Sequence, residues 1–129
     1  MSSFTHFKTG GIAANGIDIH YVEHGPGPLV IFCHGWPESW YSWRHQLQAI
    51  GDAGFRAVAL HMRGYGETTR PKDIEAYTIS HLVGDVVGSV TALGESEAIV
   101  VGHDWGGPVA WHSALMRPDI FRAVAVYRC

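Results

Sequence analysis

Apolar residues along the chain gather in short continuous runs, separated by segments in which they recur at helical spacing. The run at 29–33 has five apolar residues in a row after a glycine- and proline-rich break, which is typical of a strand buried on both faces of a parallel sheet. Similar runs predict further strands at 55–60, 98–102 and 121–127.

Between these runs, apolar residues recur every three or four positions. The clearest case follows Thr78, which can cap a helix, and ends at Gly94, a residue type that often terminates one. We also expect helices at 42–53 and 105–116. Strands that alternate with helices in this way predict an α/β fold with a doubly wound, mostly parallel sheet.

The amino-terminal part has a different pattern. Asn15-Gly16 stands between two short strand-like segments, and both residue types tolerate the positive φ of a tight turn. We therefore expect an antiparallel hairpin whose second strand covers 17–23.

Length and composition limit the possible classes of protein. A chain of 129 residues is long enough for one domain and too short for two. The net charge is only -3 and the basic residues are scattered, which excludes nucleic acid and an anionic membrane as partners. Because no apolar run is long enough for a signal peptide or a membrane span, we expect a cytoplasmic protein.

The cysteines and histidines do not indicate a metal or cofactor. Cys33 lies within an apolar run, so we expect a small buried hydrophobe rather than a disulfide with Cys129. None of the nine histidines has His-Glu-x-x-His spacing or lies beside a Cys-x-x-Cys pair. We expect neither a metal site nor a bound cofactor.

A candidate nucleophile lies between a predicted strand and a predicted helix. Gly102 and Gly106 stand two positions on either side of Asp104, and small residues there allow the sharp turn of a nucleophile elbow. We predict that Asp104 is the nucleophile and that the backbone N–H of Trp105 is one donor of an oxyanion hole. The alternative is that Asp104 only caps the following helix.

A second loop, His34-Gly35-Trp36-Pro37, follows the first buried strand. We expect the Trp36 N–H to be the second oxyanion donor, with Pro37 shaping the loop and His34 bracing it. The predicted substrate contacts are Trp36, Trp105, Pro37, His34 and His103.

An aspartate suits displacement at a saturated carbon. Its carboxylate is already an anion at neutral pH, and an epoxide oxygen or a halide could leave. The alkyl ester so formed must then be hydrolysed, which requires an activated water and an oxyanion hole.

Three motifs carry a resemblance to a known family. They are HGWPESWYSWR at 34–44, RGYG at 63–66 and GHDWGG at 102–107. Together they resemble the epoxide hydrolase branch of the α/β-hydrolase family, from about residue 10 to about residue 127. The resemblance implies that Asp104 attacks the less hindered carbon of a small-molecule epoxide, and that water cleaves the ester to a vicinal diol.

The resemblance also implies that other parts are needed. Members of the family continue into a helical cap with tyrosines and into strands with an acid and a histidine base, so residues 1–129 are expected to be the amino-terminal portion of a core domain, without those groups. His61 stands where members usually have an acid, and we interpret it as a loop or sheet-edge residue. Two alternatives stay open: a haloalkane or haloacid dehalogenase, and an inactive α/β fragment whose exposed last strand pairs with another chain.

Overall fold

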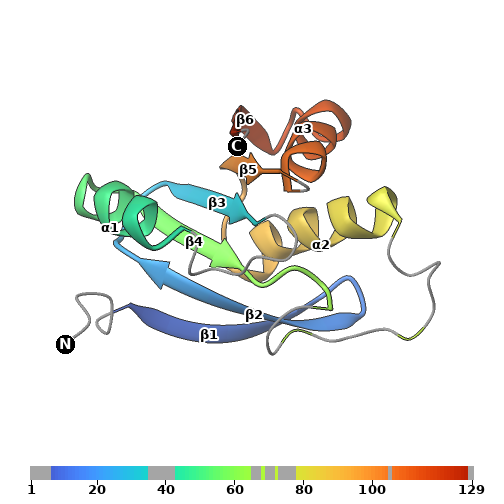
Figure 1. Cartoon of the computed structure of the whole chain (residues 1–129), viewed down its shortest axis with the longest axis horizontal. Coiled ribbons are helices and arrows are strands. Elements are labelled where there is room, and N and C mark those ends of the chain that lie inside the picture. The colour runs from blue at the N-terminus through green and yellow to red at the C-terminus, as the bar shows by residue number, and fades with distance from the viewer. Residues whose placement is uncertain are drawn as a thin grey trace.

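The computed structural model describes residues 7–34, 43–64, 68, 72, 78–104 and 106–127. Strands and helices alternate along most of this range (Figure 1). The elements, in chain order, are β1 Lys8–Ala14, β2 Ile17–His24, β3 Leu29–Cys33, α1 Arg44–Asp52, β4 Arg56–Leu60, α2 Ile79–Ala92, β5 Ala98–His103, α3 Gly106–Met116 and β6 Phe121–Tyr127.

The strands form one sheet in the order β1-β2-β4-β3-β5-β6. β3 is parallel to β4 and to β5, and β5 is parallel to β6, whereas β2 is antiparallel to both β1 and β4. Helices lie on both faces of this sheet, with α1 on one and α2 and α3 on the other. The predicted doubly wound, mostly parallel α/β fold is confirmed.

The hairpin at the amino terminus turns at the predicted residues. Asn15 has a φ of 52° and Gly16 a φ of 79°, so both turn positions are left-handed, which fits the right-handed twist of the strands. The Asn15 side chain donates to the backbone oxygen of His81 (3.1 Å) and to Oδ1 of Asp85 (3.0 Å) on α2. The turn is thus tied to the helix that packs beside β1.

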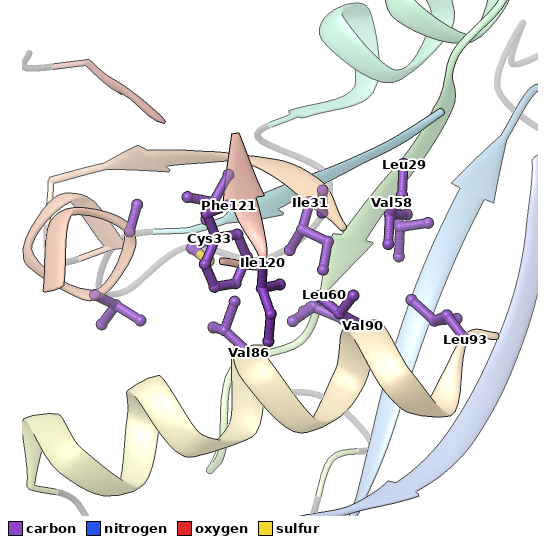
Figure 2. Close-up of a cluster of buried hydrophobic side chains, with 14 of the residues drawn as sticks. Leu29, Ile31, Cys33, Val58, Leu60, Val86, Val90, Leu93, Ile120 and Phe121 are labelled. Carbon is purple, nitrogen blue, oxygen red and sulfur yellow. The ribbon is translucent and has the colours of Figure 1, made fainter. Parts of the chain in front are cut away.

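One hydrophobic core lies between the sheet and α2. Figure 2 shows Val86, Val90 and Leu93 of α2 pointing toward side chains of β3 and β4. Thr78 caps this helix by accepting a hydrogen bond from the His81 N–H, and Gly94 follows its end at a φ of 83°. The helix predicted from Thr78 to Gly94 is therefore confirmed, and burial of its apolar face supplies most of its stability.

A second core lies on the opposite face, beneath α1. Leu47 of α1 and Trp43 just before it are buried against Phe32 of β3, and the Trp43 and Phe32 rings are 5.0 Å apart between centroids. The helix predicted at 42–53 is observed as Arg44–Asp52, while Ser42 lies outside the described residues. Within the described ranges, no helix is long and apolar enough to cross a membrane.

Candidate active site

The parallel strands β3, β4 and β5 are neighbours and end at the same edge of the sheet. Cys33, the last residue of β3, is paired with Leu60 at the end of β4 and with Gly102 near the end of β5. The residues that follow, among them His34 and His61, therefore lie along the same edge. In open α/β sheets this carboxyl edge is where ligands bind.

Asp104 occupies a strained position in the turn between β5 and α3. Its φ is 55°, a left-handed conformation that is uncommon for residues other than glycine and that usually marks a functional turn. The Gly107 N–H closes the turn by donating to the Asp104 backbone oxygen at 2.9 Å. A helix cap normally has extended backbone geometry, so the left-handed φ argues against a role in which Asp104 only caps α3.

The glycines beside Asp104 are required by close packing. A Cβ on Gly102 would collide with the backbone oxygen of Gly106, and a Cβ on Gly106 would collide with the backbone oxygen of Cys33. The start of α3 therefore lies directly against the end of β3. This contact brings the turn at Asp104 next to His34.

The Asp104 side chain is exposed and lies just before the first turn of α3. Among the residues that the structure describes, none donates a hydrogen bond to its carboxylate. A carboxylate that is presented in this way, close to the positive end of a helix dipole, is available to react.

His103 and His34 are held differently. His103 is half-buried, and its ring packs edge-on against Trp43, with 6.0 Å between the ring centroids. His34 is only 2% exposed, and its Nε2 accepts a hydrogen bond from the Met62 N–H at 3.0 Å. Because Nε2 accepts, it carries no proton, and His34 is a neutral imidazole protonated on Nδ1. The predicted contact of either histidine with substrate stays a prediction.

His61 lies in the loop directly after β4, as predicted, but it is buried and has a partner that the sequence did not indicate. His61 is only 7% exposed, and its Nδ1 lies 3.2 Å from Nδ1 of His20 on β2. The antiparallel pairing of β2 with β4, which the sequence does not reveal, brings the two rings together.

A buried ion pair holds the start of the RGYG segment against α2. Arg63 donates from Nε to Oδ2 of Asp85 (2.8 Å) and from its terminal nitrogen to Oδ1 (2.7 Å). Both side chains are almost fully buried, and the two parallel hydrogen bonds fix the guanidinium in one orientation. This pair was not predicted, since neither residue stands in a recognisable motif with the other.

Several predicted site residues lie outside the described residues. They are Trp36, Pro37 and Trp105, so their roles as oxyanion donors and substrate contacts stay predictions. Cys129, the other cysteine of the chain, also lies outside the described residues. Cys33 is buried as predicted, and burial raises the pKa of its thiol to about 12. In the described part of the chain, no group of three or more potential ligands is arranged to hold a metal ion.

Comparison with known proteins gives consistent matches. Residues 28–126 match the sequence model of a family described as alpha/beta hydrolase fold. The chain is 53% identical to an epoxide hydrolase from Caballeronia sordidicola, over 96% of this chain and 39% of that protein. It is 50% identical to bifunctional epoxide hydrolase 2 from Sus scrofa, over 85% of this chain and 20% of that protein.

Solved structures give the same result for the fold. The chain superimposes on an epoxide hydrolase from Vigna radiata with a TM-score of 0.93 and 46% identity, covering 97% of this chain and 41% of that one. An epoxide hydrolase from an endophytic Streptomyces gives a TM-score of 0.93 at 51% identity, covering 95% of this chain and 37% of that one. The chain therefore spans about two fifths of the length of these relatives or less.

Proposed function

Because the chain belongs to the α/β hydrolase fold family, we propose that it is the nucleophile-bearing part of an epoxide hydrolase. The observation that carries this proposal is the left-handed φ of 55° at Asp104, between two glycines that have no room for a side chain. A strained turn with that packing fits a nucleophile elbow. The similarity to named epoxide hydrolases supports an epoxide as the substrate class.

The proposed step is ring opening by the carboxylate. An oxygen of Asp104 forms a bond to the less hindered epoxide carbon, and the bond from that carbon to the ring oxygen breaks. The electron pair stays on the ring oxygen, which takes up a proton, and a hydroxyalkyl ester of Asp104 results. Hydrolysis of this ester passes through an oxyanion, for which we propose the backbone N–H groups of Trp36 and Trp105 as donors.

The test is covalent labelling of the purified chain with a reactive aryl epoxide such as styrene oxide. Intact-mass spectrometry should show a gain equal to the whole epoxide, since ring opening loses no atoms, and peptide mapping should place it on Asp104. Asp104→Asn should abolish the adduct. Asp119→Asn, which changes an exposed carboxylate just beyond α3, is the matched control and should leave it intact.

Two results would contradict the proposal. One is a folded protein whose labelling is confined to cysteine or histidine, because epoxides alkylate those residues without an elbow. The other is an adduct that forms with a haloalkane probe, with release of halide, and not with the epoxide. That outcome would instead support the dehalogenase alternative.

We propose separately that the β6 edge and the neighbouring face of α3 associate with a second copy of this chain. Trp111, Leu115 and Met116 of α3 are 52%, 62% and 58% exposed, and Val126 of β6 is 42% exposed. In the described part of the chain, β6 pairs only with β5, and an unpaired strand edge of this kind can accept a further strand. A sedimentation-equilibrium experiment that shows a stable monomer at high concentration would contradict self-association, and Leu115→Glu should weaken any association observed.

A further inference from the structure

Three imidazoles from different parts of the sheet lie close together at its carboxyl edge. Nδ1 of His20 lies 3.2 Å from Nδ1 of His61, and the two ring centroids are 5.0 Å apart. The ring of His34 stands edge-on to that of His61, with 6.5 Å between the centroids. The cluster does not react with substrate in the mechanism proposed above, so its arrangement requires another explanation.

The backbone around the pair is held in place by three hydrogen bonds. The His61 N–H donates to the His20 backbone oxygen at 2.9 Å. Thr68 is buried between the same two residues: its Oγ1 accepts from the His20 N–H at 2.9 Å and donates to the His61 backbone oxygen at 2.8 Å. The backbones of the two histidines cannot separate without breaking these bonds.

The Nδ1 to Nδ1 contact restricts the number of protons that the pair can hold. One nitrogen must donate and the other accept, so a neutral pair and a pair with one added proton both preserve the hydrogen bond. When both rings are protonated, two N–H donors face each other and two positive charges lie in a poorly solvated site. The hydrogen bond between the two rings is therefore lost when both are protonated.

The pair is connected to His34 through one peptide unit. Met62 follows His61 directly, and the Met62 N–H donates to Nε2 of His34 at 3.0 Å. Displacement of His61 would move this N–H, and His34 is the last described residue before the Gly35-Trp36-Pro37 segment.

We propose that His61 and His20 are positioning residues that hold His34 in place through the Met62 N–H, and that this hold is lost when both are protonated. The catalytic consequence rests on the proposed function, because it concerns the segment to which the proposed Trp36 donor belongs. The structural device itself does not depend on that function.

Among the residues that the structure describes, the charged side chain that follows His61 most closely in the sequence is neutralised by its own partner. Arg63 follows His61 by two residues, and its charge is matched by Asp85 of α2 in the buried ion pair. His34 itself must be neutral to accept from Met62, so its own protonation acts in the same direction. Acidification thus weakens the hold from each of the three rings.

The experiment is long-range proton–nitrogen NMR of histidine rings in the full chain, recorded from pH 8 to pH 5, a range that brackets the ordinary imidazole pKa of about 6.5. At pH 8, His34 should be protonated on Nδ1 and bare on Nε2. On acidification, the Met62 amide should exchange roughly tenfold faster than the change in intrinsic rate explains, as expected for the loss of its hydrogen bond.

Two variants separate positioning from mere packing. In His61→Asn the side chain can still bond to His20 but cannot add a second charge, so the acid-induced exchange of the Met62 amide should be much reduced. His20→Asn removes the other member and should act in the same way if His61→Asn does not fold. His81→Asn, at an exposed histidine of α2, is the matched control and should retain the wild-type acid response.

The inference is wrong if His34 is protonated on Nε2 at pH 8, or if His61→Asn and His20→Asn show the wild-type acid response. The epoxide labelling of Asp104 in the wild-type chain distinguishes this failure from failure of the proposed function. An absent adduct with the expected NMR behaviour would remove the epoxide assignment and leave the positioning role.

Discussion

Asn15 and Asp104 each stand in a turn with nearly the same φ, and they differ in what their side chains do. Within the described ranges these are the two residues other than glycine with positive φ, 52° and 55°. The Asn15 side chain donates two hydrogen bonds to α2, while the Asp104 carboxylate accepts no hydrogen bond from the described residues. In the hairpin, the side chain's own hydrogen bonds offset the cost of the left-handed φ. At Asp104, the packing of the surrounding backbone keeps the residue in that conformation.

This difference separates a turn that builds the fold from a turn that presents a chemical group. Asparagine adopts left-handed geometry more readily than most residues, so the hairpin carries little strain to begin with. At Asp104 the strain persists because Gly102 and Gly106 allow α3 to pack against β3. Each of the predictions below alters one side of this contrast.

The largest expected effect concerns the ion pair that anchors the hairpin turn. Asp85→Ala leaves the Arg63 guanidinium buried without its carboxylate and should lower the free energy of unfolding by about 3 to 5 kcal/mol. Urea unfolding followed by tryptophan fluorescence measures this loss. The double variant Arg63→Met/Asp85→Leu should recover most of it, and a double variant as unstable as Asp85→Ala would contradict the explanation.

The next effect concerns the packing that maintains the turn at Asp104. Gly106→Ala should lower the free energy of unfolding by about 3 kcal/mol, because the new Cβ meets the backbone oxygen of Cys33. The matched control is Gly16→Ala in the hairpin, where a Cβ has nothing within 4 Å and only the φ of 79° opposes it. The control should lose about 1 to 2 kcal/mol, and equal losses in the two variants would remove the contrast.

Asn15→Ala tests the local compensation in the hairpin. The variant keeps the left-handed φ with a residue that tolerates it less well and loses both hydrogen bonds to α2, so the free energy of unfolding should fall by about 2 kcal/mol. Asn15→Gly should lose about half of that, since glycine relieves the backbone but not the lost bonds. Thermal or urea denaturation of the three proteins gives the comparison.

The smallest effect has the opposite sign. Asp104→Gly should raise the free energy of unfolding by about 0.5 to 1 kcal/mol, because glycine relieves the left-handed strain and no hydrogen bond from the described residues is lost. The same variant should form no epoxide adduct. A destabilised Asp104→Gly protein would mean that the carboxylate supports the fold.

Local patterns predicted most of the secondary structure. β3 and β6 were predicted with the bounds that the structure shows. Neighbouring residues alone indicated Asp104 as a candidate, since it stands between two glycines, and its role as nucleophile stays a prediction. The His20–His61 contact and the Arg63–Asp85 pair were not predicted, since each joins residues that meet only through the pairing of distant strands or the packing of a helix.

The strand order has a consequence for how the chain reaches its native state. β3 is flanked in the sheet by β4 and β5, so Ile31 pairs with Val58 and with Val100, both of which are made later in the chain. During synthesis β3 therefore remains unpaired until β4 and β5 have been made. Pairings between residues that are distant in the sequence also slow folding. We expect this apolar strand to be the segment for which molecular chaperones compete while the polypeptide is still leaving the ribosome.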